Sequence, residues 1–166
     1  MSFQARLIDA KLHEERVRDR LIARGWHAEL FGQGQLSDET RAHLREVDTA
    51  VRWMPDIIAS KRFAARTIVV FIDAKAGERY KKTGNHDVEV AALISAEKWI
   101  ELSGEACPYY FVYDDGGVAT PDRIRETGKP GPNYGNGSGT PYLIFPALVC
   151  RPFDAMFGPP VEQGVA

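Results

Sequence analysis

The feature that most constrains the fold is the run TIVVFIDAK at residues 67–75. Apolar and β-branched residues follow one another in this run, so both faces of an extended chain would be apolar. A strand of this kind lies at the centre of a sheet whose two faces are covered by helices. The run therefore predicts a buried central strand that ends on the polar residues Asp73 and Lys75.

The segments around this strand predict an alternating α/β chain. Apolar residues at helical spacing near the N-terminus predict a helix over about 5–24 that ends at Gly25; they are Leu7, Ala10, Val17 and Leu21. The other expected elements are strands at 26–32, 50–60 (interrupted at Pro55) and 108–114, a helix at about 86–102, and short helices at 37–47 (N-capped by Ser37) and 121–126. The order αβββαβ predicts an α/β fold with a mixed central sheet flanked by helices.

The length of 166 residues suits a single domain. We expect residues 1–126 to form its core. Residues 127–166 should pack on the same domain, adding a Gly/Pro-rich loop at 128–139, a strand at 140–150 and a tail that frays after Phe157. No apolar run approaches the roughly 20 residues of a membrane span. The N-terminus lacks the apolar segment of a signal peptide, so we expect a cytoplasmic location and no membrane partner.

Charge and cysteine content constrain the function only weakly. Cys107 and Cys150 belong to no CxxC pair, which indicates reduced, buried thiols. The formal net charge of −2 argues mildly against a nucleic-acid partner, although divalent metal bound to carboxylates would offset it. Two basic clusters are candidate nucleic-acid contacts or simply solvated surface: Lys61, Arg62 and Arg66, and Arg79, Lys81 and Lys82.

The end of the central strand presents an acid and an amine together. Residues two apart on a strand share a face, so Asp73 and Lys75 project to the same side. A carboxylate there can hold a metal ion, while the ammonium orients water or stabilises negative charge. A second Asp-x-Lys triplet at Asp9 and Lys11 lies in a predicted helix, where residues two apart do not share a face. We therefore expect Lys11 to play no part in catalysis.

Two further acids complete the candidate site. Asp56 lies 17 residues before Asp73, in the preceding strand-like segment, and an antiparallel pairing of the two strands would bring the acids together. Neighbouring carboxylates repel each other and are commonly held by a divalent cation. Glu14 falls within the apolar stripe of the first helix, where an acid needs a partner. The simpler alternatives are that Asp56 caps a turn beside Pro55 and that Glu14 makes a peripheral salt bridge.

This pattern resembles a known nuclease superfamily. Glu14 in the first helix, Pro55-Asp56, and Asp73-x-Lys75 after an apolar strand resemble the PD-(D/E)xK, or restriction-endonuclease-like, superfamily. The helix sequence HEERVRDRLIARGW at 13–26 looks like the opening of archaeal-type Holliday-junction resolvases. Those enzymes usually carry Glu at the position of Asp73. The resemblance implies hydrolysis of phosphodiester bonds with Mg²⁺ or Mn²⁺.

The resemblance also implies a role for each residue. Asp56, Asp73 and the backbone carbonyl of Ala74 would ligate metal, Glu14 would ligate a second metal or a metal-bound water, and Lys75 would position or activate the attacking water. The helix after the motif often adds a polar residue, for which Asn85, His86 and Glu89 are the candidates. A simpler reading places His86 on the surface at the start of that helix. Similarly, the tyrosines of 108–114 are read as core residues in preference to base-stacking ones.

Three functional hypotheses follow from these observations. The first is a metal-dependent DNA nuclease: a structure-specific endonuclease, an end-processing enzyme, or a resolvase, which would act as a homodimer. The second is a non-catalytic nucleic-acid-binding or assembly module on the same fold. The third is an unrelated α/β protein in which the motif occurs by chance. Metal bound between the second and third strands would separate the third hypothesis from the other two.

Overall fold

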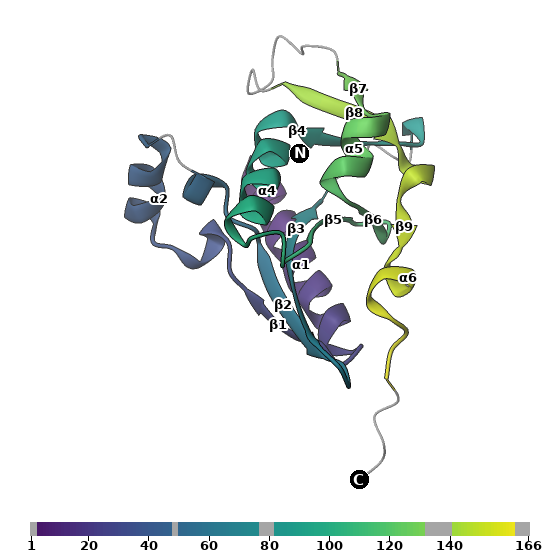
Figure 1. Cartoon of the computed structure of the whole chain (residues 1–166). Coiled ribbons are helices and arrows are strands. Elements are labelled where there is room, and N and C mark those ends of the chain that lie inside the picture. Colours follow the sequence, from purple (N-terminus) through teal and green to yellow (C-terminus); the bar gives the residue numbers. More distant parts are fainter. Residues whose placement is uncertain (1–2, 48–49, 77–81, 132–140, 162–166) are drawn as a thin grey trace.

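The centre of the molecule is a mixed sheet. The computed structural model describes residues 3–47, 50–76, 82–131 and 141–161. Within these ranges a six-stranded sheet has the order β1-β2-β3-β5-β6-β9 (Figure 1). Its strands are β1 His27–Leu30, β2 Ile57–Arg62, β3 Thr67–Lys75, β5 Tyr109–Tyr113, β6 Gly117–Ala119 and β9 Arg151–Pro152. β3 pairs antiparallel with β2 and parallel with β5, so the predicted mixed sheet is confirmed.

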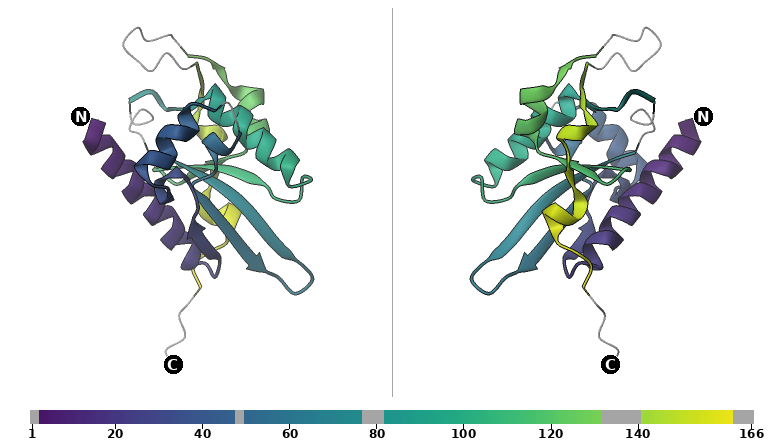
Figure 2. Two further views of the ribbon diagram at one scale, coloured as in Figure 1. Left: turned by 90° about the vertical axis from the view of Figure 1, so that its left-hand side faces the viewer. Right: turned by 90° about the vertical axis from the view of Figure 1, so that its right-hand side faces the viewer.

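Helices cover both faces of this sheet. α1 (Phe3–Ile22) runs diagonally along one side, whereas α4 (Val90–Leu102) lies on the other and links β3 to the parallel strand β5 (Figure 2). The shorter helices are α2 Asp38–Arg45, α5 Pro121–Thr127 and α6 Phe153–Phe157, with 3₁₀ turns η1 Gln33–Gln35, η2 Ala50–Trp53 and η3 Ala147–Val149. In the described part of the chain, no helix has the length and apolar character needed to cross a membrane.

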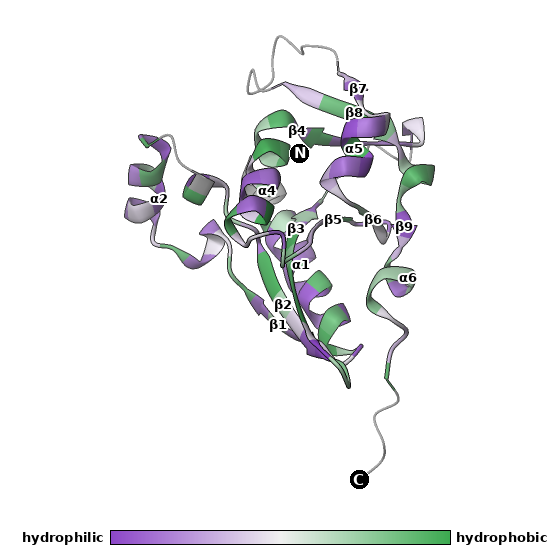
Figure 3. Ribbon diagram, viewed as in Figure 1, coloured by the Kyte–Doolittle hydropathy of each residue, from purple (hydrophilic) through white to green (hydrophobic). Residues whose placement is uncertain are grey.

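β3 lies between two hydrophobic cores because its side chains alternate between the faces of the sheet. Val70, Ile72 and Ala74 pack with Val17 and other residues on the α1 side. Phe71 packs in the second core, which includes side chains of α4. Hydrophobic residues accordingly concentrate along β2 and β3 (Figure 3). The prediction of a central strand covered on both faces is confirmed.

A second sheet was not predicted. β4 (Asn85–Glu89), β8 (Tyr142–Pro146) and β7 (Lys129–Pro130) form a small antiparallel sheet in the order β4-β8-β7. The expectation of a helix from residue 86 is therefore wrong, because α4 begins at Val90. In β4 the buried His86 and Val88 alternate with half-buried neighbours, which is the period of a strand.

Other boundaries also differ from those expected. The segment before Pro55 forms η2, and the strand starts only after it, at Ile57. Similarly, the strand expected at 140–150 ends at Pro146 and gives way to η3. The tail does not fray directly after α6, because the N–H of Val161 donates to the carbonyl of Ala23 at 2.9 Å. Most of the 128–139 loop lies outside the described residues.

Cys107 and Cys150 are half-buried free thiols.

Candidate active site

Asp73 and Lys75 lie together at the end of β3. The buried Ala74 between them anchors the strand in the α1-side core, which leaves both polar side chains on the opposite face. The Lys75 Nζ and the Asp73 Oδ1 are 2.9 Å apart, within an ion pair. The geometry expected from the two-residue strand period is therefore present.

Asp56 lies beside Asp73 because β2 and β3 are antiparallel. Ile57 pairs with Ile72, so Asp56 occupies the next position along, opposite Asp73. Its Oδ2 accepts a hydrogen bond from the N–H of Ala74 at 2.8 Å. This contact with β3 fixes the carboxylate next to the Asp-x-Lys triplet, which a simple cap of the turn at Pro55 would not do.

Glu14 reaches the same place from α1. Val17 and Leu21, one and two turns later, are buried in the α1-side core, and Glu14 is half-buried at the edge of that stripe. Gly34 in η1 faces it, since a Cβ at Gly34 would lie 3.8 Å from the Glu14 Oε2. The apolar spacing of the helix therefore directs Glu14 toward the end of β3.

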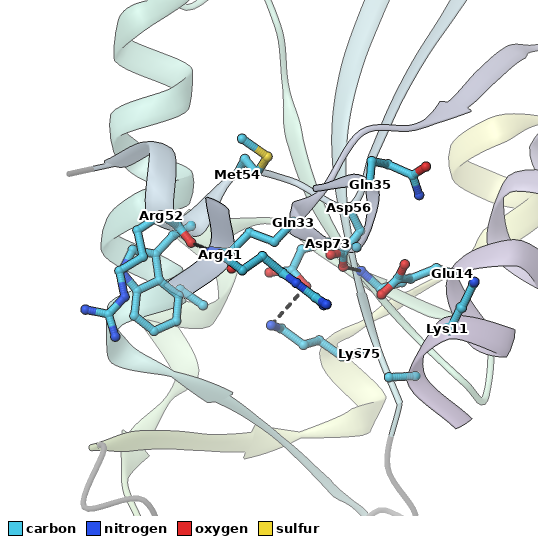
Figure 4. A pocket seen from close by; sticks show the side chains of 15 residues that line it. Lys11, Glu14, Gln33, Gln35, Arg41, Arg52, Met54, Asp56, Asp73 and Lys75 are labelled. Atoms are coloured by element: carbon cyan, nitrogen blue, oxygen red, sulfur yellow. Dashed lines mark hydrogen bonds and ion pairs between the residues drawn. The ribbon is translucent and has the colours of Figure 1, made fainter. Parts of the chain in front are cut away.

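These four side chains line one cavity of about 550 Å³ (Figure 4). The cavity lies between α1, the end of β3, the start of α4, and the segment that joins β1 to β2. Its remaining lining residues are Ala10, Lys11, Gln33, Gly34, Gln35, Arg41, Arg52, Trp53, Met54, Ala74 and Ala92. The structure thus brings Glu14, Asp56, Asp73 and Lys75 around a single space.

Burial and mutual repulsion disturb the titration of this cluster. Burial, followed by the charges of Asp73 and Glu14, raises the pKa of Asp56 well above its usual value. Burial and the charge of Asp73 likewise raise the pKa of Glu14. Burial alone would lower the pKa of Lys75, but the carboxylates of Asp73 and Asp56 outweigh it and raise this pKa. Lys75 is therefore an ammonium ion at neutral pH.

The carboxylates at the cavity are of the chemical type that binds a hard divalent cation. Three carboxylates at one cavity offer the oxygen ligands that Mg²⁺ and Mn²⁺ prefer, and a cation would relieve the repulsion that raises the pKa values. Among the described residues no group of three or more His, Cys, Asp or Glu side chains already encloses a metal position. Asp73 is paired with Lys75. The carboxylates would therefore have to draw together around an ion.

The three accessory candidates lie on β4 and differ in their surroundings. Glu89 directly precedes α4, and its charge raises the pKa of Lys75. His86 is buried, so its expected place on the surface is wrong. Its Nε2 lies 3.0 Å from the Asp115 Oδ2, and its ring stacks on Tyr113 with the ring centroids 3.9 Å apart. Asn85 pairs with Pro146 across the small sheet. None of the three residues lines the cavity.

The predicted nucleic-acid contacts are not gathered at the cavity. Lys61 donates from Nζ to the carbonyl of Arg24 at 2.6 Å, beside the C-terminal end of α1. Arg62 and Lys82 are exposed, and Lys81 lies outside the described residues. The tyrosines of β5 pack in the cores, as expected, with Tyr109 and Tyr113 buried and Tyr110 packed against the α1-side cluster.

Several cavity residues were missed by the sequence interpretation. Lys11 lines the cavity, although Asp9 of the same triplet does not. Asp9 and Lys11 therefore do not share a face, as expected. Lys11 nevertheless lies one turn before Glu14, and its charge lowers the pKa of Glu14. The i,i+3 spacing of Lys11 and Glu14 was the available signal. Arg41 and Arg52 carried no such signal.

Comparison with known proteins defines the fold. No protein-family model and no curated protein matches this sequence. Among solved structures, a Holliday junction resolvase from the archaeal hyperthermophile Archaeoglobus fulgidus has 10% sequence identity and a TM-score of 0.52, over 92% of this chain and 98% of that chain. A nuclease from a fusselovirus has 12% identity and a TM-score of 0.49, over 91% of this chain and 88% of that chain. The likeness to the resolvase and the observed order of elements show that this chain has the restriction-endonuclease-like fold.

Proposed function

We propose that this protein is a metal-dependent nuclease that hydrolyses phosphodiester bonds in DNA. The observation that carries the proposal is that Glu14, Asp56, Asp73 and Lys75, from separate parts of the chain, line one cavity. The restriction-endonuclease-like fold supports the same chemistry. The archaeal neighbour is described as a Holliday junction resolvase, so branched DNA is the first substrate to test, and a resolvase would act as a homodimer. Flaps and free ends are the other substrates of interest.

Each residue of the cluster has a chemical role in this proposal. Asp56, Asp73 and the backbone carbonyl of Ala74 would hold Mg²⁺ or Mn²⁺, and Glu14 would hold a second ion or a water molecule. The bound ion stabilises negative charge on the phosphate that is attacked. Lys75 carries a proton, because its neighbouring carboxylates raise its pKa. In this state it can orient the attacking water or donate to a phosphate oxygen.

The reaction also needs a proton acceptor. The oxygen of water forms a bond to phosphorus while the bond from phosphorus to the leaving sugar oxygen breaks, and solvent supplies the proton for that oxygen. The proton lost by the attacking water needs a nearby base. Glu14 suits this role where it holds a water molecule, because its carboxylate lines the same cavity as Asp56 and Asp73.

The first experiment is a cleavage assay on labelled single strands, duplexes, flaps and four-way junctions, with Mg²⁺ or Mn²⁺ and with EDTA. We expect metal-dependent cleavage that falls by about a hundredfold or more in Asp73→Asn and Lys75→Ala, because transition-state contacts of this kind contribute about that factor. Asp9→Asn is the matched control, since Asp9 belongs to the same Asp-Ala-Lys tripeptide but does not line the cavity. Lys98→Ala, an exposed site on α4, is the control for Lys75.

The outcomes separate the hypotheses. Full activity in Asp73→Asn or Lys75→Ala would show that the assigned site is wrong. Tight binding of DNA without any cleavage by the wild-type protein, unchanged in Asp73→Asn, would instead identify a non-catalytic binding module.

A further inference from the structure

The segment that joins β1 to β2 stands out from the body of the molecule. We define this segment, residues 31–54, as the arm; it contains η1, α2 and η2, and α2 lies well to the side of the sheet (Figure 1). The structure describes every residue of α2, and none of them is buried. The arm is attached near its two ends. Phe31 contacts the ring of Trp99 edge-on, and the Ser95 hydroxyl donates to the carbonyl of Trp53 at 3.0 Å.

The arm changes the charge of the cavity. The acidic lining residues are Glu14, Asp56 and Asp73, and the basic ones are Lys11, Lys75, Arg41 and Arg52. Four basic groups against three acidic groups leave the lining at +1 before any cation binds, although the whole chain carries −2. Two of the four basic groups, Arg41 and Arg52, belong to the arm. Without them the lining would carry −1 before any cation binds.

We propose that Arg41 and Arg52 bind a backbone phosphate next to the one that is cleaved, so that the arm holds the substrate strand over the carboxylates. This inference rests on the proposed nuclease function. A guanidinium group presents two parallel N–H donors to phosphate oxygens, a geometry that lysine does not provide. The substrate is therefore recognised here by its phosphate backbone and not by its bases.

Both arginines can exchange their present contacts for a phosphate. Arg41 forms an ion pair with Asp38, whose side chain is 93% exposed, and such exposed pairs are weak. Arg52 donates to the carbonyl of Arg45 at 3.4 Å, the long end of a hydrogen bond, and its guanidinium lies 5.4 Å from the centroid of the Trp53 ring. Neither interaction fixes the guanidinium as firmly as a buried carboxylate would.

The test compares Arg41→Ala and Arg52→Ala with Arg123→Ala. Arg123 is the matched control, because it pairs with Glu126 at the same i,i+3 spacing in a short helix but does not line the cavity. The probes are a fluorescein-labelled four-way junction and a labelled single strand from one of its arms. Binding is measured by anisotropy in Ca²⁺ over a range of salt concentrations, and cleavage is measured in Mg²⁺.

We expect each arm variant to weaken binding by about ten- to hundredfold, the effect of removing one charge-assisted hydrogen bond. The slope of log affinity against log salt should become shallower by about 0.7–0.9 for each phosphate that the variant no longer neutralises. KM should rise while kcat stays nearly unchanged, since the arginines hold the substrate and do not touch the reacting atoms. Arg41→Lys should restore the salt slope but only part of the affinity, which a purely structural role would not produce.

The results distinguish this inference from the nuclease proposal. If the wild type cleaves DNA and the arm variants match Arg123→Ala in affinity and salt slope, the role of the arm is wrong and the nuclease stands. If the wild type binds but never cleaves, and the arm variants bind weakly, the phosphate contact stands and the nuclease fails. If the wild type binds neither probe, both fail. Unchanged melting temperatures will show that the variants fold, as expected for residues outside both cores.

Discussion

Asp56 shows how a residue suited to bind a cation can lower the folding stability of the metal-free protein. Its carboxylate is confined with those of Asp73 and Glu14, and burial together with their charges raises its pKa. When the pKa of a group is higher in the folded than in the unfolded protein, the folded state binds more protons and the stability falls as pH rises. Ionised Asp56 therefore destabilises the fold until a cation compensates it.

Replacement of Asp56 by Asn should consequently stabilise the protein in EDTA. Asn can still accept the hydrogen bond from the N–H of Ala74, and it removes the buried charge. We expect a higher melting temperature than wild type at pH 7, by about 2–4 °C for each kcal/mol gained. The difference should shrink as the pH falls toward the ordinary carboxyl pKa, where Asp56 becomes neutral in both states.

Calorimetry or circular dichroism over a pH series will measure this effect, with Asp9→Asn as the control. Added Mg²⁺ should raise the melting temperature of the wild type and leave that of Asp56→Asn nearly unchanged. A melting temperature below wild type at pH 7 in EDTA would contradict the repulsion described for this cluster.

Among the elements, the first residues of the arm, just before η1, contact the candidate metal ligand Asp56. The N–H groups of Phe31 and Gly32 both donate to the carbonyl of Asp56, at 2.7 and 3.1 Å. A Cβ at Gly32 would lie 2.9 Å from the Asp56 Cα, closer than real contacts allow. The φ of Gly32 is −62°, a value open to any residue, so contact with Asp56, and not backbone strain, requires glycine there.

Gly32→Ala and Gly34→Ala therefore form a matched pair. Gly32→Ala must displace Asp56 or the arm, and a displacement near 1 Å at a reacting site lowers the rate by about a hundredfold. At Gly34 the added Cβ lies 3.8 Å from the Glu14 Oε2, an ordinary contact, so we expect nearly wild-type cleavage. Cleavage rates and melting temperatures of the two variants will measure this difference. Equal activity in the two variants would show that the close contact of Gly32 does not fix Asp56.

The elements predicted correctly from sequence are those whose signal is local. β3 was predicted with its observed bounds, and the N-cap of α2 was also identified, with the N–H of Thr40 donating to the Ser37 hydroxyl. β4 was missed because its partner β8 lies more than 50 residues away, and its five residues merge with the apolar pattern of α4. α6 is equally short, and its burial depends on contacts with distant residues such as Trp26.

The same distinction applies to the candidate site. Asp73, Lys75 and Glu14 could be proposed from strand and helix periodicity, and the antiparallel pairing with Asp73 was expected for Asp56. Arg41 and Arg52 could not be predicted, because the path of the arm depends on tertiary contacts such as that of Ser95 with Trp53. The functional roles of all these residues stay predictions until the cleavage assays are made.

At the scale of the whole molecule, the C-terminal segment completes the α1-side core. Phe153 and Phe157 of α6 are buried there, and the indole N–H of Trp26 donates to the carbonyl of Phe157 at 2.9 Å. Arg24, near the end of α1, is ion-paired with Asp154. Residues more than 120 positions apart in sequence thus hold α1, and with it Glu14, against the sheet.

Phe157→Ala should therefore lower the stability of the entire domain. Truncation of a buried phenylalanine typically costs about 3–5 kcal/mol, and each kcal/mol corresponds to about 2–4 °C in melting temperature at this size. Leu148→Ala is the control, because the Leu148 side chain is 86% exposed and should lose less than about 0.5 kcal/mol. Thermal unfolding of the two variants will measure the difference. Equal melting temperatures would show that α6 is not part of the core.

The absence of buried residues in α2 has a consequence for how this protein can evolve. Substitutions in that helix are not opposed by loss of core packing, whereas the carboxylates depend on β3, which both cores constrain. Under the proposed function, substitutions or insertions within α2 would change the contacts with the substrate backbone and leave the carboxylate cluster unaltered. A library randomised in this helix alone would be a direct route to variants with new substrate preferences.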